Sequence, residues 1–141
     1  MGEQAPYRDD LAQGPEMRAE WLRTSDGVRI RVGHAEAADS KGTVFILPGR
    51  TEYIEKYGRT AKDLVRAGFD VVSLDWRGQG MSDRLGADPM VGHVGRFIDF
   101  QKDWAAVRSF AGKADLPKPW HMIVHSMGGC MGLRALMSGT D

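Results

Sequence analysis

Several features are scarce or missing in this 141-residue chain, and each absence excludes a class of protein. The single cysteine, Cys130, rules out an internal disulfide and a metal site built from several cysteines. Lys plus Arg number 19 and Asp plus Glu number 19, so no net charge favours nucleic acid or an anionic membrane. No apolar run approaches the roughly 20 residues that span a bilayer, and residues 1–20 lack the apolar segment of a signal peptide. These absences predict a soluble, cytoplasmic protein without metal, cofactor or nucleic acid.

The beginning of the chain shows no hydrophobic periodicity. Residues 1–15 combine Gly, Pro, Gln and charged residues, and we expect a flexible arm there, ahead of a single domain over residues 16–141. Two short strand-like runs follow, at residues 21–24 and 28–32, with an Asp-Gly pair between them. Asp-Gly between two β-compatible runs predicts a β-hairpin.

After the hairpin, apolar runs alternate with amphipathic stretches. Strands are predicted at residues 43–47, 69–74 and 121–125, and helices at residues 54–65, 97–111 and 127–137. The strand runs do not alternate with polar residues, which suits strands covered by helices on both faces. Strands that alternate with helices predict an α/β protein with a parallel sheet.

Ser126 is informative because of its surroundings. Ser-x-Gly occurs three times, at Ser25, Ser40 and Ser126, but the first two stand in turns, where both residue types are expected for backbone reasons. Only Ser126 separates a predicted apolar strand from a predicted helix. That arrangement is typical of a nucleophile elbow, a strained turn that exposes a reactive serine. The alternative is an ordinary turn in which Ser126 caps the helix.

The predicted helix after Ser126 is rich in glycine. Gly128, Gly129 and Gly132 each cost about 1 kcal/mol relative to alanine inside a helix, which implies that the helix approaches the strand closely. The start of a helix also directs backbone N–H groups and the positive end of its dipole at the serine. The N–H group of Met127 is the first donor available to an oxyanion there.

Three motifs follow predicted strands in order along the chain. Residues 47–53 read Leu-Pro-Gly-Arg-Thr-Glu-Tyr, residues 75–82 read Asp-Trp-Arg-Gly-Gln-Gly-Met-Ser, and residues 125–129 read His-Ser-Met-Gly-Gly. The last resembles the nucleophile elbow of α/β-hydrolases, above all of their monoacylglycerol lipase and lysophospholipase branch. The second resembles the Asp-x-Arg-Gly-x-Gly-x-Ser loop of that superfamily, and the first stands where the family has its His-Gly oxyanion loop. The resemblance covers residues 21–137.

The resemblance implies a role for each matched residue. Ser126 would be the nucleophile of a serine carboxylic-ester hydrolase, forming an acyl-enzyme, and the backbone N–H groups of Arg50 and Met127 would form the oxyanion hole. The residues implied to support the site structurally are Gly49, Arg77, Gly78, Gly80, Gly128 and Gly129. The implied substrate is a small lipid ester, an acylglycerol or a lysophospholipid. Transient contact with a membrane surface stays open.

Two residues depart from the family's pattern. Family members usually carry Gly, sometimes Ala, two residues before the serine, where this chain has Val124. We expect the β-branched side chain to crowd the elbow. Pro48 replaces the usual His, which we expect to alter the hydrogen bonding of the loop more than its path.

No histidine follows Ser126, although the family order is serine, then acid, then histidine. The histidines are His34, His93, His121 and His125. Successive side chains leaving a strand point to opposite sides, so we interpret His125 as a packed or hydrogen-bonded loop residue instead of the base. We expect His93 at the surface or at the entry to a helix.

Two other residues invite a functional interpretation. Asp75 stands at a strand end, and we expect it to orient the Gly-rich loop that follows it instead of serving as the catalytic acid. Cys130 lies one turn into the last helix. We expect it to face the sheet as a small buried side chain.

The predicted fold class is therefore the N-terminal part of an α/β-hydrolase: a β-hairpin followed by parallel strands with helices on both faces, in an incomplete sheet. By analogy, the C-terminal half would hold the cap, the acid and the histidine, and we expect it to be required. We expect the 141-residue polypeptide alone to be inactive, and unstable or aggregated unless a complementary segment binds it.

Two alternatives compete with an ester hydrolase. A catalytically inactive fragment, or a degenerate hydrolase module used for binding, agrees with the lack of a base and with Val124. Nucleotide binding is disfavoured because Asp83 takes the place of the third glycine of the dinucleotide fingerprint. Pro89 and Gly92 also lie where its helix would run.

Overall fold

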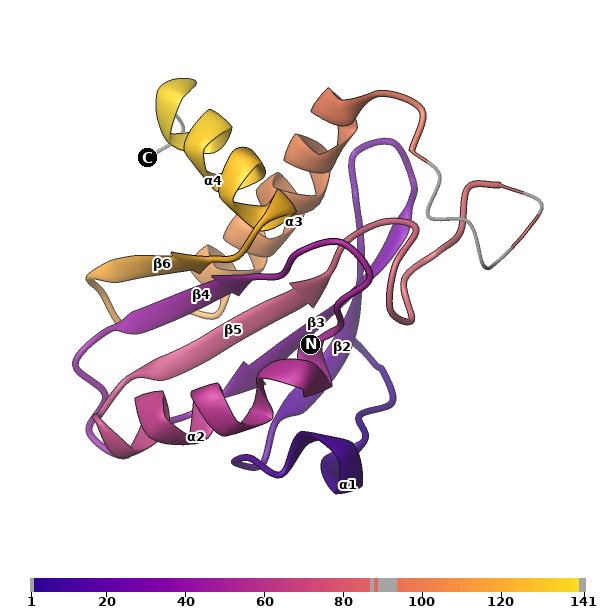
Figure 1. The fold of residues 1–141 in the computed structure, drawn as a ribbon. Coiled ribbons are helices and arrows are strands. Elements are labelled where there is room, and N and C mark those ends of the chain that lie inside the picture. The colour runs from indigo at the N-terminus through magenta and orange to yellow at the C-terminus, as the bar shows by residue number, and fades with distance from the viewer. Residues whose placement is uncertain (1, 87, 89–93, 140–141) are drawn as a thin grey trace.

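A computed structural model shows how these elements are arranged, and it describes residues 2–86, 88 and 94–139. Six strands form one sheet in the order β1-β2-β3-β5-β4-β6 (Figure 1). The strands are β1 Glu3–Gln4, β2 Arg18–Arg23, β3 Arg29–Ala35, β4 Thr43–Leu47, β5 Asp70–Asp75 and β6 Trp120–Val124. The helices are α1 Asp9–Ala12, the 3-10 turn η1 Ile54–Tyr57, α2 Gly58–Arg66, the 3-10 turn η2 Phe97–Asp99, α3 Phe100–Lys113 and α4 Met127–Met137.

The sheet is mixed, with an antiparallel part and a parallel part. Strands β2 and β3 form the predicted hairpin, with Arg23 opposite Arg29, and β3 also pairs antiparallel with β5. Strand β4 lies between β5 and β6 and is parallel to both. All five residues of β4 are buried, as expected for a strand covered on both faces. The prediction of a hairpin followed by parallel strands is confirmed.

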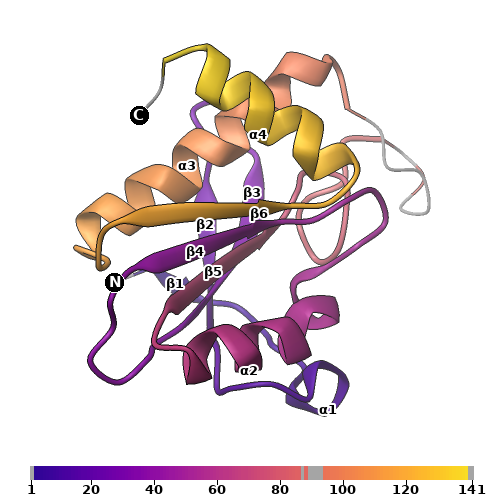
Figure 2. The same ribbon diagram turned by 60° about the vertical axis from the view of Figure 1, so that its left-hand side comes forward.

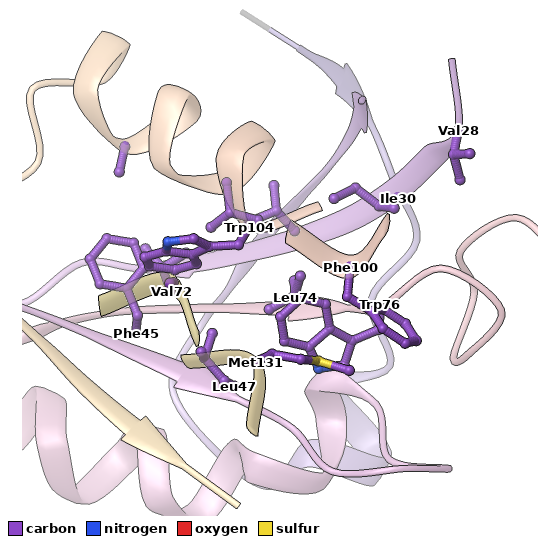
Figure 3. Packing of buried hydrophobic residues seen from close by; sticks show 14 of the residues in the cluster. Val28, Ile30, Phe45, Leu47, Val72, Leu74, Trp76, Phe100, Trp104 and Met131 are labelled. Atoms are coloured by element: carbon purple, nitrogen blue, oxygen red, sulfur yellow. The ribbon is translucent and has the colours of Figure 1, made fainter. Parts of the chain in front are cut away.

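Helices cover both faces of this sheet. In Figure 2, α2 lies on one side of β4 and β5, and α3 and α4 lie on the other. Alternate residues of β4 divide between two cores, since Phe45 and Leu47 pack toward α3 and α4 whereas Ile46 packs toward α2. Figure 3 shows the larger core, where the Phe45 and Trp104 rings meet edge to face with their centroids 5.3 Å apart. The two cores therefore bury β4 from both faces.

The N-terminal segment contains two short elements where the sequence predicted none. Strand β1 pairs with β2, with Glu3 opposite Trp21, and α1 follows it. Ala5 is buried in the core on the α2 side of the sheet, and Ala12 of α1 is buried as well. Tertiary contacts therefore stabilise β1 and α1, although the sequence there has no hydrophobic periodicity. The flexibility of residues 1–15 stays a prediction.

The prediction for Cys130 was wrong, because its side chain is exposed. The buried residues of α4 are Gly128, Met131, Gly132 and Ala135. This stripe passes through positions three and four residues apart, as expected for the contact face of a helix. At 3.6 residues per turn, Cys130 lies on the opposite face of α4 from this stripe.

The β6 side of the sheet is apolar and open. Strand β6 is the last strand of the sheet, and its Ile123 and Val124 are exposed. Leu133, Leu136 and Met137 of α4 are exposed as well. An open strand edge beside an exposed apolar surface is a site of contact with other polypeptide.

No helix in residues 2–86, 88 and 94–139 is long and apolar enough to cross a membrane.

Replacing Leu133 and Leu136 together with Gln is expected to reduce self-association of the 141-residue polypeptide. These side chains are 60% and 63% exposed on α4, and Gln has nearly the helix propensity of Leu. Leu11→Gln is the control, because Leu11 is 55% exposed on α1, away from β6. Sedimentation velocity at several concentrations measures the association. Equal association of both variants and the wild type would show that this surface does not drive it.

Candidate active site

Ser126 lies at the sharp turn between β6 and α4. Its backbone angles are φ 52° and ψ −117°, a conformation that is strained for any residue other than glycine. Ser126 is the N-cap residue of α4, but its side chain makes no capping hydrogen bond to the helix. The residue is exposed. The turn therefore presents, on a strained backbone, a hydroxyl that makes no hydrogen bond to the described residues.

Close approach of α4 to β4 produces this turn. A Cβ on Gly128 would lie 2.6 Å from the carbonyl oxygen of Pro48 and closer still to that of Leu47. Because both obstacles are backbone atoms, no rotamer change makes room for them. Glycine at this position is required by packing.

Val124 is accommodated by the glycines of the same helix. A Cβ on Gly132 would lie 3.0 Å from Val124 Cγ1 and 2.6 Å from Met122 Sδ. A Cβ on Gly129 would lie 3.6 Å from Val124 Cγ2, an ordinary contact. The β-branched side chain that departs from the family's pattern thus occupies space that Gly132 leaves free.

The loop after β4, residues 48–53, runs beside this turn. Side chains at the end of β5 and in the loop after it hold the backbone of this loop at two points and that of Ile54, the first residue of η1, at a third. Trp76 Nε1 donates to Pro48 O at 2.9 Å, Thr51 N donates to Gln79 Oε1, and Ile54 N donates to Asp75 Oδ1 at 2.9 Å. The path of the loop is therefore set by the neighbouring strand.

Two backbone N–H groups near Ser126 stay available. Gly49 and Thr51 donate their N–H groups to side-chain oxygens, but for the Arg50 N–H between them the described residues provide no acceptor. Met127 is the first residue of α4, and the first N–H groups of a helix have no intrahelical partner. Donors from two different elements thus lie on the segments that flank the turn.

Glu52 joins the loop after β4 to the turn at Ser126. Its Oε1 accepts hydrogen bonds from the Gly49 N–H, from the Tyr57 hydroxyl at 2.7 Å and from His125 Nδ1 at 3.0 Å. Lys56 donates to its Oε2. The interpretation of His125 as a hydrogen-bonded residue is confirmed. No role for Glu52 was predicted from the sequence.

These contacts set the protonation of the cluster. Burial alone raises the pKa of Glu52, but hydrogen bonds from Lys56, Tyr57 and His125 outweigh burial and lower that pKa from 4.5 to about 2. Burial and the bond to Glu52 raise the pKa of Tyr57 above its ordinary value. Glu52 is therefore a carboxylate at neutral pH and Tyr57 a neutral donor.

Asp75 lies at the centre of a second, fully buried cluster. Its Oδ2 accepts from Arg31 Nε and from the Met81 N–H, each at 2.8 Å, while Oδ1 accepts from Ile54 N. Arg31 also pairs with Glu55 at 2.5 Å. The carboxylate thus joins the loop after β5 to the start of η1. This geometry agrees with the expectation that Asp75 orients its loop.

Arg77 anchors the other end of the Gly-rich loop. It is buried, with Nε 2.8 Å from Asp103 of α3 and Nη1 2.9 Å from Asp26 in the hairpin turn. Gly78 and Gly80 have φ values of 79° and 53°, which side chains disfavour. The conformation of this loop therefore requires both glycines.

The remaining histidines lie apart from Ser126 or outside the described residues. His34 Nε2 is 2.8 Å from Asp70 Oδ2 at the start of β5, and His121 packs edge-on against Phe69. His93 lies outside the described residues. In the part of the chain that the structure describes, no group of three or more His, Cys, Asp or Glu side chains is placed to hold a metal ion.

Several known proteins are similar to this chain in sequence. The model of the family Hydrolase_4, described as serine aminopeptidase, S33, matches residues 38–140. Lysophospholipase L2 of Escherichia coli K12 is 43% identical over 109 residues, which cover 75% of this chain and 31% of that protein. The chain thus spans about a third of the length of the curated relatives it matches.

Solved structures agree on the fold. Esterase Pf2001 of Pyrococcus furiosus superposes with a TM-score of 0.72 at 22% identity, over 96% of this chain and 51% of that one. An α/β hydrolase from Novosphingobium aromaticivorans gives a TM-score of 0.67 at 25% identity, over 89% of this chain and 41% of that one. The predicted fold class is confirmed.

Replacing Gly128 with Ala is expected to destabilise the fold by about 1–3 kcal/mol, the usual cost of overpacking against atoms that cannot move aside. Gly129→Ala is the matched control in the same turn of helix, because its nearest neighbour would be 3.6 Å away. That variant is expected to be neutral or to gain up to about 1 kcal/mol from helix propensity. Urea unfolding measures both. Equal stabilities of the two variants would contradict the close approach of α4 to β4.

The stability contributed by Glu52 is expected to depend on pH. A carboxylate whose folded-state pKa is lowered contributes fully above its unfolded pKa, and the contribution is lost as pH falls toward the folded value. The stability difference between wild type and Glu52→Gln is therefore expected to be constant above about pH 5 and to shrink from pH 4.5 toward about pH 2. Urea unfolding across this range tests it, with exposed Glu36→Gln as control. A difference that does not change with pH would contradict the ionised cluster.

Proposed function

Because this chain belongs to the Hydrolase_4 family, described as serine aminopeptidase, S33, we propose that it carries the nucleophile of a serine carboxylic-ester hydrolase. The observation that carries the proposal is the turn at Ser126. Its hydroxyl is exposed, does not cap α4, and sits on the strained backbone that a nucleophile elbow requires. No structural role of the side chain accounts for that strain.

Ser126 Oγ attacks the ester carbonyl and forms a tetrahedral intermediate. The alcohol leaves, the acyl group stays on Oγ, and a water molecule then releases the acid and restores the hydroxyl. The N–H groups of Arg50 and Met127 donate to the negatively charged oxygen of each intermediate. The absence of a described acceptor for the Arg50 N–H and the position of Met127 at the start of α4 support this role.

The glycines and Arg77 act through the backbone that carries these groups. Gly49 and Gly128 permit close approach between the loop after β4 and the elbow. Gly78, Gly80 and Arg77 hold the loop after β5, which in turn holds the oxyanion loop. Gly129 makes no close contact, so it contributes less than the others.

The substrate proposed is a small lipid ester, a lysophospholipid first and a monoacylglycerol second. The support is the 43% identity to a protein named lysophospholipase L2, which exceeds the identity to either solved structure described above. Transient contact with a membrane surface would accompany such a substrate.

The general base and acid come from polypeptide other than the described residues. Among the described residues no basic side chain is hydrogen-bonded to Ser126, and the imidazoles of His125 and His34 are bonded to Glu52 and Asp70. The open β6 edge and the exposed apolar face of α4 are where further strands and helices would pack. The greater length of the relatives agrees with such a segment.

A catalytically inactive binding module is the second candidate. The lack of a base among the described residues favours it for this polypeptide alone. It predicts no covalent chemistry at Ser126 in any context, so labelling separates the two functions.

The test is labelling of the whole gene product with a fluorophosphonate probe, together with hydrolysis of a lysophospholipid, a monoacylglycerol and an aminoacyl anilide. We expect labelling at Ser126, faster hydrolysis of the esters than of the anilide, and loss of at least about 10³-fold in kcat on Ser126→Ala. A wild-type protein that is not labelled, or a Ser126→Ala variant that hydrolyses esters equally fast, would refute the proposal.

A further inference from the structure

We infer that Glu52 is a positioning residue: through Gly49 and His125, its carboxylate holds the two N–H donors of the oxyanion hole at their working separation. The inference rests on the proposed function of Ser126. It gives a role to a residue of the motif at residues 47–53 for which the sequence predicted none.

One carboxylate oxygen contacts both segments that carry a donor. Glu52 Oε1 accepts from the Gly49 N–H, which immediately precedes the Arg50 N–H, and from His125 Nδ1, two residues before Met127. The Glu52 side chain is only 5% exposed. Its hydrogen bonds therefore replace those that water would otherwise make, and losing one leaves a buried acceptor unpaired.

The two donors have no short covalent connection. Arg50 and Met127 are 77 residues apart in the sequence, by subtraction of their numbers, and they follow different strands. An oxyanion hole works only if both N–H groups reach one oxygen, at about 2.7–3.1 Å. A link between the loop and the elbow is therefore a functional requirement.

The space between the two segments is filled. A Cβ on Gly49 would lie 2.8 Å from Glu52 Oε1 and 3.2 Å from both Nδ1 and the carbonyl oxygen of His125. The backbone adds a hydrogen bond of 3.2 Å from His125 N to Leu47 O. The loop, the carboxylate and the elbow form one packed unit.

The donors around Glu52 divide between its two oxygens. Lys56 donates to Oε2, whereas the Tyr57 hydroxyl of η1 donates to Oε1 beside the Gly49 N–H and His125 Nδ1. A carboxylate only accepts hydrogen bonds, so His125 Nδ1 carries the proton in this contact. The His125 side chain is 63% exposed, so this bond fixes the ring more than burial does.

Loss of this link is expected to affect the transition state more than substrate binding. A displaced Arg50 or Met127 N–H weakens the bonds to the developing negative charge, whereas the neutral ester carbonyl depends on them less. Removal of a whole oxyanion donor costs about 10²–10³-fold in kcat. A displaced donor is expected to cost less, about 10–10²-fold.

The experiment measures hydrolysis of p-nitrophenyl butyrate by the whole gene product. Glu52→Ala is expected to lower kcat about 10–10²-fold with KM within about twofold, per active site titrated with a fluorophosphonate. Glu52→Gln is expected to recover part of the loss, since an amide oxygen accepts the same bonds. The amide N–H of Asn can replace the His125 Nδ1–H, so His125→Asn is expected to have a higher kcat than His125→Ala. Exposed Glu36→Ala is the control and is expected to match wild type.

Two outcomes would overturn the inference while leaving the proposed function intact. One is that Glu52→Ala loses activity only because fewer of its sites react with the fluorophosphonate, so that kcat per titrated site equals that of the wild type. The other is a Glu52→Ala/His125→Ala double variant whose kcat losses simply multiply, because linked residues must be non-additive. If wild type neither labels at Ser126 nor hydrolyses esters, the proposed function fails instead. The same double-variant cycle on urea unfolding then tests the link, and zero coupling overturns it.

Discussion

The structure around Ser126 depends on how closely the start of α4 approaches the end of β4. Gly128 lies against the carbonyl oxygens of Leu47 and Pro48, where a side chain of any size is excluded. Because β4 lies between β5 and β6, this approach brings the elbow and the loop after β4 to the same edge of the sheet. The Ser126 hydroxyl and the backbone N–H groups of Arg50 and Met127 thus lie at one edge of the sheet, on segments that are far apart in the sequence.

Buried charged side chains hold the loops that follow the strands at that edge of the sheet. Asp75 joins the loop after β5 to η1, Arg77 ties the same loop to Asp103 on α3, and Glu52 joins the loop after β4 to the elbow. Burying a charge carries a desolvation cost that pairing offsets at best in part. The concentration of such groups at this edge of the sheet therefore indicates that the loops there must be held in position more tightly than an apolar core alone would hold them.

The sequence predicted correctly those strands and helices whose ends are marked by a residue nearby in the chain. The predictions for residues 43–47 and 127–137 coincide with β4 and α4, because Pro48 ends the apolar run and Ser126 precedes the small residues. Cys130 was misassigned because α4 is apolar on nearly every side, so periodicity cannot identify its buried face. Strand β1 and the contacts of Glu52 depend on tertiary neighbours and on the path of a loop, and neither has a period in the sequence.

The central claim is that Ser126 carries the acyl group during ester hydrolysis. The most direct measurement is mass spectrometry of peptides from the whole gene product, quenched with acid during turnover of an ester with an isotopically labelled acyl chain. The account predicts that the peptide containing Ser126 gains the mass of the labelled acyl group and that fragmentation places it on Ser126. Turnover with the label on another residue, or with no acylated peptide under conditions that accumulate a known acyl-enzyme, would contradict it.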